Sequence, residues 1–195
     1  MFSGCTSLTV APELPATTLA NYCYQGMFCN CTSLTTAPEL PAVTMTNYCY
    51  SLMFAECTSL TTVPKLPATT LANSCYGHMF LNCTSLTVSP ELPVTTLADF
   101  CYDSMFKGCT SLTTAPELPA ATLVRGCYET MFNRCTNLRY IKCLATDISA
   151  SDCTYYWVSG VSSAGTFIKN PSITESTWGR GSSAIPNNWA VEDAS

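Results

Sequence analysis

The sequence repeats itself with a fixed step of 26 residues, and this step limits the folds open to the chain. The methionine of a Met-Phe pair recurs at Met1, Met27, Met53, Met79, Met105 and Met131. A cysteine before threonine keeps the same step, at Cys5, Cys31, Cys57, Cys83, Cys109 and Cys135, and so does a cysteine before tyrosine, at Cys23, Cys49, Cys75, Cys101 and Cys127. One short unit cannot bury its apolar face alone, so fixed periods of about 20 to 50 residues indicate units that stack on their neighbours. The repeat therefore predicts a solenoid.

The composition fits a packed chain and excludes several functional classes. Hydrophobic residues make up 47% of the chain and charged residues only 11%, whereas disordered chains combine low hydrophobicity with high net charge. The net charge of -5, with only 8 Lys and Arg residues, argues against binding to nucleic acid through phosphate neutralisation. No apolar run reaches the roughly 18 residues that a membrane helix needs, so we expect no direct insertion into a membrane.

The pattern within one repeat predicts three elements. Leu19, Cys23, Met27 and Cys31 are spaced four apart, which indicates the apolar stripe of a helix of two to three turns. The segment S-L-T-T-A-P reads as a short strand that must end before Pro38, because proline cannot donate a ladder hydrogen bond. A P-E-L-P corner joins the two. We therefore expect an α/β, right-handed solenoid of the leucine-rich-repeat type, with one short parallel strand and one short helix per coil.

The repeat resembles a known family. The run M-F-x-x-C-T-S-L-T-x-A-P is similar to the BspA-like leucine-rich repeats, whose units typically read A-F-x-x-C-x-x-L-x-x-I-x-I-P, and the match covers residues 1 to about 142. The chain departs from ordinary leucine-rich repeats because it lacks the L-x-x-L-x-L-x-x-N core and is longer and rich in threonine. The resemblance implies a cell-surface or secreted interaction protein of a host-associated microbe, or a related phage-borne protein.

The repeat pattern ends near residue 142, which predicts two regions. Residues 1–142 hold about five and a half repeat units and begin in mid-repeat, so we interpret the chain as a fragment or a mature piece. Residues 143–195 contain all three tryptophans and are expected to form a C-terminal cap over the last repeat. Within them, Ser149–Val161 reads as a last, atypical helix with Trp157 facing inward, while G-T-F-I-K and N-N-W-A-V-E-D read as short strands. A separate ligand-binding domain is the alternative.

Of the fourteen cysteines, the eleven that recur with the repeat are expected to be reduced, buried spacers. Neighbouring helices pack about 8–10 Å apart, beyond the roughly 4.4–6.8 Å that a disulfide spans between Cα atoms; Cys143 and Cys153 are the pair to consider if any bond forms. The spacings match no metal site. His78 is the only histidine, and no motif places a base beside a nucleophile. We therefore predict no enzyme activity, no cofactor and no metal.

Two surfaces are candidates for binding. On the strand side, Thr9, Thr35, Thr61, Thr87 and Thr113 should stack beside a row formed by Glu13, Glu39, Glu91 and Glu117 and interrupted by Lys65. This side is nearly uniform, so it suits only a repetitive ligand. The predicted outer helix face is the more varied surface, and exposed aromatic residues are favoured interface anchors. Drift at solvated positions is the first account of this variation. Our hypothesis for any specific partner is that it binds on this face, through Tyr22, Tyr48, His78, Phe100, Asp103 and Lys107.

These features together favour a non-catalytic module for extracellular recognition or adhesion. The expected partner is a protein or glycan on a host or neighbouring cell surface, and the expected location is extracellular or at the cell surface. The alternatives are a component of a phage tail or fibre, located in the virion, and a purely structural spacer in a larger surface protein. The repeat pattern leaves the ligand and the oligomeric state open.

Overall fold

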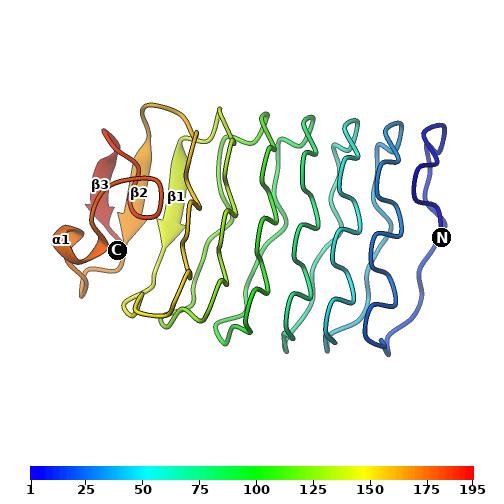
Figure 1. The fold of residues 1–195 in the computed structure, drawn as a ribbon, viewed down its shortest axis with the longest axis horizontal. Coiled ribbons are helices and arrows are strands. Elements are labelled where there is room, and N and C mark those ends of the chain that lie inside the picture. The colour runs from blue at the N-terminus through cyan, green and yellow to red at the C-terminus, as the bar shows by residue number, and fades with distance from the viewer.

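A computed structural model describes all residues from 1 to 195, and its repeats form coils that lie side by side along the long axis (Figure 1). The first residues lie at one end of the stack, and the only helix and the continuous strands lie at the other (Figure 1). These are β1 (Tyr140–Cys143), β2 (Thr166–Lys169), α1 (Glu175–Trp178) and β3 (Ala190–Asp193). The three strands form one parallel sheet in the order β1-β2-β3. The arrangement is consistent with a repeat solenoid.

The helix predicted for each repeat is absent, and α1 is the only helix in the chain. In its place each coil carries a run of β-turns, in which the N–H groups of Cys23, Gln25 and Met27 donate to the carbonyl three residues earlier. The backbone φ is positive at Tyr22, Gly26 and Asn30, as the third position of a type II turn requires. We call these runs the turn ribbons: residues 20–31, 46–57, 72–83, 98–109, 124–135 and 150–161.

Hydrogen bonds between coils explain why a turn ribbon replaces the helix. The N–H groups of Tyr22 and Tyr24 donate to the carbonyl oxygens of Asn47 and Cys49 in the next coil, both at 3.0 Å. A helix would use these donors internally and would hold its neighbour about 8–10 Å away. The inward Phe and Tyr rings at equivalent positions of successive coils stack at 5.6 to 6.2 Å between centroids. The four-residue spacing in the sequence therefore reflects a backbone that repeats every four residues, and the prediction of an α/β coil was wrong in its helical half.

The predicted parallel pairing of the strands is present, but in most coils it is reduced to single bridges. Val10 pairs with Thr36, Thr36 with Thr62, and Thr114 with Tyr140, all in parallel. Continuous strands form only at the C-terminal end, where β2 pairs with β1 on one side and β3 on the other. A proline lies two residues after Thr36, Thr62 and Thr114 and cannot extend the ladder, which limits the strand to a bridge.

The core consists of columns of identical side chains. Phenylalanine and tyrosine form two stacked columns, represented at their centre by Phe80 and Tyr76, and methionine, cysteine and leucine fill the space beside them. Both columns end on Trp157, which is fully buried and stacks on Trp178 at 5.8 Å between ring centroids. Trp157 faces inward as predicted, although its segment is a turn ribbon and the predicted helix over Ser149–Val161 was wrong.

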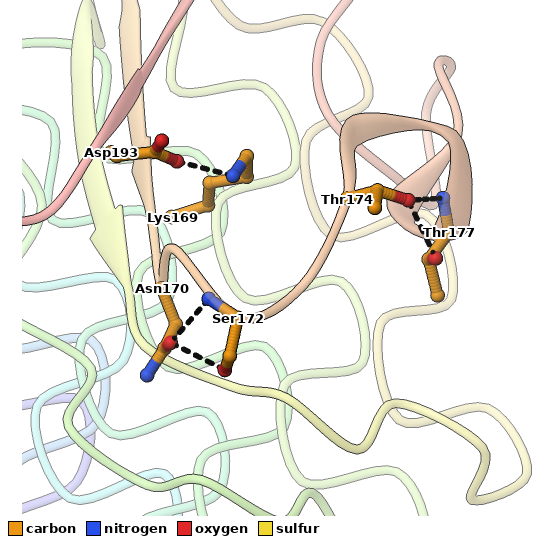
Figure 2. A network of polar contacts seen from close by, with 6 residues as sticks. All are labelled: Lys169, Asn170, Ser172, Thr174, Thr177 and Asp193. Atoms are coloured by element: carbon orange, nitrogen blue, oxygen red, sulfur yellow. Dashed lines mark hydrogen bonds and ion pairs between the residues drawn. The ribbon is translucent and has the colours of Figure 1, made fainter.

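Polar contacts hold the C-terminal segment in place (Figure 2). Lys169 on β2 forms an ion pair with Asp193 on β3, and its side chain is only 10% exposed. The Asn170 side-chain oxygen accepts from the N–H and Oγ of Ser172, at 2.9 and 2.7 Å, which stabilises the turn after β2. Thr174 caps α1 by accepting from the Thr177 N–H at 3.1 Å. No helix in the structure has the length and apolar character needed to cross a bilayer.

Candidate binding surface on the turn ribbons

The turn ribbon sorts its side chains in pairs, two inward and then two outward. In residues 73–83, Cys75, Tyr76, Met79 and Phe80 are buried, whereas the pairs at 73–74 and 81–82 lie partly or fully at the surface. The inward pairs are the central residues of turns without a positive φ, and each outward pair ends on a residue with a positive φ. The third pair of this coil is 77–78, in which Gly77 is buried and His78 is partly exposed. Every coil therefore directs three pairs toward the same face, although some of their members, such as Ala55 and Ser104, are buried. This ribbon face is the candidate surface.

All six residues predicted to bind lie on the ribbon face, although no helix carries them. Tyr22, Tyr48 and Phe100 share one column, at the first positive-φ position of their coils. His78 occupies the second positive-φ position of its coil, and Asp103 and Lys107 lie at outward positions one residue before a positive-φ residue. The structure does not gather the six into one pocket; it divides them between an aromatic patch near the N-terminal end and a mixed patch around Phe100.

The aromatic patch is a stacked pair. The rings of Tyr22 and Tyr48 lie 4.8 Å apart between centroids and within 7° of parallel. Tyr22 is 54% exposed, so part of the stack is accessible to solvent. Tyrosine supplies a large, rigid and amphipathic contact area at a low entropic cost. The stack is therefore a platform on which a planar or apolar group of a partner can rest.

The mixed patch includes two residues that sequence reasoning missed, Arg125 and Gly126. The guanidinium carbon of Arg125 lies 5.3 Å from the centroid of the Phe100 ring, within the range of a cation–π interaction. The ring lies over Gly126 in the next coil, where an added Cβ would approach Phe100 Cε1 to 2.2 Å. A glycine one repeat after a bulky residue was the available signal, because equivalent positions stack directly on each other.

Polar groups in the next outward columns form a second part of this patch. His78 Nδ1 lies 3.7 Å from Asp103 Oδ2, and Asp103 Oδ1 accepts from Ser104 Oγ at 2.8 Å. Burial, reinforced by the negative charges of Asp103 and Asp152, raises the pKa of Glu129 above its usual value. Lys107 has no carboxylate within ion-pair distance. The patch combines acidic and basic groups beside an aromatic ring, which suits recognition of a polar partner.

The cysteines fill space in the core, and many of them also form hydrogen bonds between coils, which the sequence did not predict. All fourteen are free thiols, and nine of the eleven repeated cysteines are buried, as are Cys143 and Cys153. The prediction of burial was wrong for Cys5 and Cys23, which lie exposed in the first coil. Cys57 Sγ donates to the Phe28 carbonyl of the preceding coil at 3.1 Å, and the same contact recurs along the column. The spacing argument against disulfides assumed helices and does not hold, because the coils lie closer together than helices do. These thiols link adjacent coils by hydrogen bonds as well as filling space.

The chemistry of the buried thiols is that of unreactive groups. Burial raises the pKa of Cys57, Cys75, Cys127, Cys135 and Cys143 to about 12. A nucleophilic thiol needs a lowered pKa, because the thiolate is the reactive form. The structure also contains no group of three or more His, Cys, Asp or Glu side chains placed to hold a metal ion.

Comparison with known proteins finds no matching protein family, no matching curated protein and no matching solved structure. The similarity to BspA-like repeats therefore rests on the repeat motif itself.

Proposed function

We propose that this chain is a non-catalytic recognition or adhesion module, a right-handed solenoid related to the BspA-like leucine-rich repeats, that works outside the cell. Its partner in this proposal is a protein or glycan on a host or neighbouring cell surface. The observation that carries the proposal is the contrast between the two sides of the turn ribbon. Inward residues are nearly identical from coil to coil, whereas outward residues differ and include the exposed stack of Tyr22 on Tyr48.

The ribbon face has the physical properties of a recognition surface. Its backbone is held by hydrogen bonds on every coil, so the backbone loses little further freedom when a partner binds. Aromatic and arginine residues carry much of the binding energy in protein interfaces, and both types occur here as preorganised pairs, Tyr22 with Tyr48 and Phe100 with Arg125. Diverse neighbouring groups allow a specific partner to be distinguished.

A pair of surface variants tests the proposal. One protein carries Tyr22→Ser, Tyr48→Ser and Phe100→Ser. The other carries Thr35→Lys, Thr61→Lys and Thr87→Lys on the side of the coils that forms the parallel β-bridges, which we call the bridge side. Binding is measured on a glycan array and on cultured host cells, with circular dichroism to verify that both variants fold. We expect only the aromatic variant to lose binding, by about 30-fold or more, as for truncation of interface hot spots. Loss confined to the threonine variant would place recognition on the bridge side.

A structural role, as a spacer in a surface protein or in a phage tail or fibre, is the second candidate. It is favoured by the uniform stacking of the coils, in which the Phe and Tyr columns continue from the first coils to Trp157. In that case both triple variants would leave attachment unchanged while core variants abolish it.

A further inference from the structure

The P-E-L-P corners form a surface of their own, which we call the corner face. It comprises residues 12–15, 38–41, 64–67, 90–93 and 116–119. In each corner the leucine is buried and the preceding residue is exposed. Open grooves lie between neighbouring corners: about 310 Å³ between 12–15 and 38–41, about 480 Å³ between 64–67 and 90–93, and about 440 Å³ between 90–93 and 116–119. Each of these spaces is large enough to admit a long side chain.

The backbone of the first four corners is unpaired. No backbone or side-chain donor of the protein reaches their carbonyl oxygens, and their N–H groups donate to no protein acceptor. Each corner has four carbonyl oxygens but only two N–H groups, because both prolines lack one. Glu13, Glu39 and Glu91 add exposed carboxylates to three of the four. The corner face is therefore rich in acceptors, poor in donors and negatively charged, so it is complementary to a ligand that supplies donors and positive charge.

In the last corner, 116–119, the backbone and the carboxylate do have partners within the chain. There the neighbouring segment is β1, an extended strand with a lysine. The Leu118 N–H donates to the Lys142 carbonyl at 3.0 Å, and the Leu144 N–H donates to the Leu118 carbonyl at 2.9 Å. Lys142 Nζ lies 3.1 Å from Glu117 Oε2. An extended segment that carries one lysine thus pairs with a P-E-L-P corner within this chain.

We propose that the corner face binds an extended polypeptide segment rich in arginine or lysine. The aliphatic part of such a side chain lies against the proline walls of a groove, and its head group donates to the carboxylates and the free carbonyls. Arginine is the better match, since its guanidinium carries five N–H donors and no acceptor. The groove between 12–15 and 38–41 carries Glu13 and Glu39. The groove between 90–93 and 116–119 carries Glu91 beside Glu117, which Lys142 already pairs.

Lys65 is the exception on this face and provides a sharp test. It replaces the glutamate of the other corners, lines the groove between 64–67 and 90–93, and has no carboxylate within ion-pair distance. A basic ligand is repelled there. Lys65→Glu restores the residue that the other corners carry, so folding is expected to be unaffected. This surface is separate from the ribbon face, and the inference does not depend on the proposed adhesion function.

The experiment measures binding of a fluorescent peptide of alternating arginine and serine by anisotropy at low salt. Lys65→Glu should tighten binding about tenfold, whereas Lys107→Glu, the same charge change on the ribbon face, should alter it less than about twofold. Glu91→Gln, which affects two grooves, should weaken binding about three- to fivefold, and Glu129→Gln on the ribbon face should not. A peptide with citrulline in place of arginine, which keeps the shape without the charge, should not bind.

Each contrary result overturns a stated part of the inference. Equal tightening by Lys65→Glu and Lys107→Glu would show attraction to net charge and no docking on the corner face. Undiminished binding of the citrulline peptide would exclude the ionic contacts. Binding of neutral oligosaccharides to the corner face in preference to the arginine peptide would reject the polypeptide as occupant. Failure of the peptide to bind both the unmodified chain and Lys65→Glu would reject the corner face as a site.

Discussion

Replacement of Gly126 by alanine distinguishes the turn ribbon from the helix that its sequence pattern suggests. Gly126 has φ +58°, and a Cβ at this position would meet the Phe100 ring at 2.2 Å. In a helix, Gly→Ala substitution stabilises by about 1 kcal/mol. In the turn ribbon we expect the opposite sign.

The expected magnitude is the sum of opposing contributions. An L-residue in the left-handed region costs about 1–2 kcal/mol, and displacement of Phe100 from Arg125 removes a cation–π interaction worth about 0.5–1 kcal/mol. Exposure of apolar surface on the displaced ring adds about 1 kcal/mol at roughly 25 cal/mol per Å². The reduced entropy of the unfolded chain offsets about 0.4–1 kcal/mol. Gly126→Ala should therefore destabilise the fold by about 2 kcal/mol, which corresponds to a fall of about 4–8 °C in Tm.

Gly77 is the matched control, because it lies in a turn ribbon without a positive φ and an added Cβ would meet only ordinary contacts, the nearest at 3.4 Å from the Ser74 carbonyl oxygen. Gly77→Ala should be neutral or slightly stabilising. In a Phe100→Ala background, Gly126→Ala should cost only about 1 kcal/mol, because the clash is absent and the backbone strain remains. The assay is urea unfolding followed by circular dichroism. Stabilisation by both Gly126→Ala and Gly77→Ala would refute the turn ribbon.

Three further predictions concern the core and the C-terminal segment. Cys83→Ala removes the 3.1 Å contact from the thiol to the Phe54 carbonyl and leaves a small cavity; it should cost about 1–2 kcal/mol in urea unfolding, and an unchanged midpoint would contradict a linking role for the thiol. Burial holds five thiols protonated by raising their pKa from 9 to about 12. Because these thiols ionise first in the unfolded chain, their contribution to folding stability is complete below pH 9 and is lost between pH 9 and 12. The loss amounts to about 1.4 kcal/mol per thiol by about pH 10. Thermal melts across this range should therefore show Tm falling steeply above pH 9, and a flat profile to pH 11 would indicate accessible thiols. Asp193→Ala leaves the buried Lys169 ammonium without its partner and should destabilise more than Lys169→Met, as compared in the same urea assay, because an unpaired buried charge costs more than a lost pair; the reverse order would show that the pair is effectively solvated.

The sequence alone was sufficient to predict the period of the repeat, the parallel stacking of the coils and most of the inward residues. Residues that recur every 26 positions as Met-Phe, Cys-Thr and Cys-Tyr can be buried together only if their coils stack in register, and the structure buries Met79, Phe80 and Cys83 in that way. The inward position of Trp157 and the strands β2 and β3 were also predictable, because short apolar segments bounded by turn residues can bury their side chains only against the last coil. The variable outward positions were correctly located on one face, although the element that carries them was not.

Only the tertiary structure decided between helix and turn ribbon. Within one coil a four-residue stripe suits either conformation, and an isolated segment would avoid the positive φ of Leu52, Glu56 and Thr130, which costs non-glycine residues free energy. The cost is offset by hydrogen bonds that exist only when another coil is present, such as those from the Leu52 and Glu56 N–H groups to Gly77 and Leu81. The contact of Phe100 with Arg125 over Gly126, the thiol links between coils and the unpaired corners likewise depend on the neighbouring coil. Local sequence determines which side chains must be buried; the distance between coils determines which backbone can bury them.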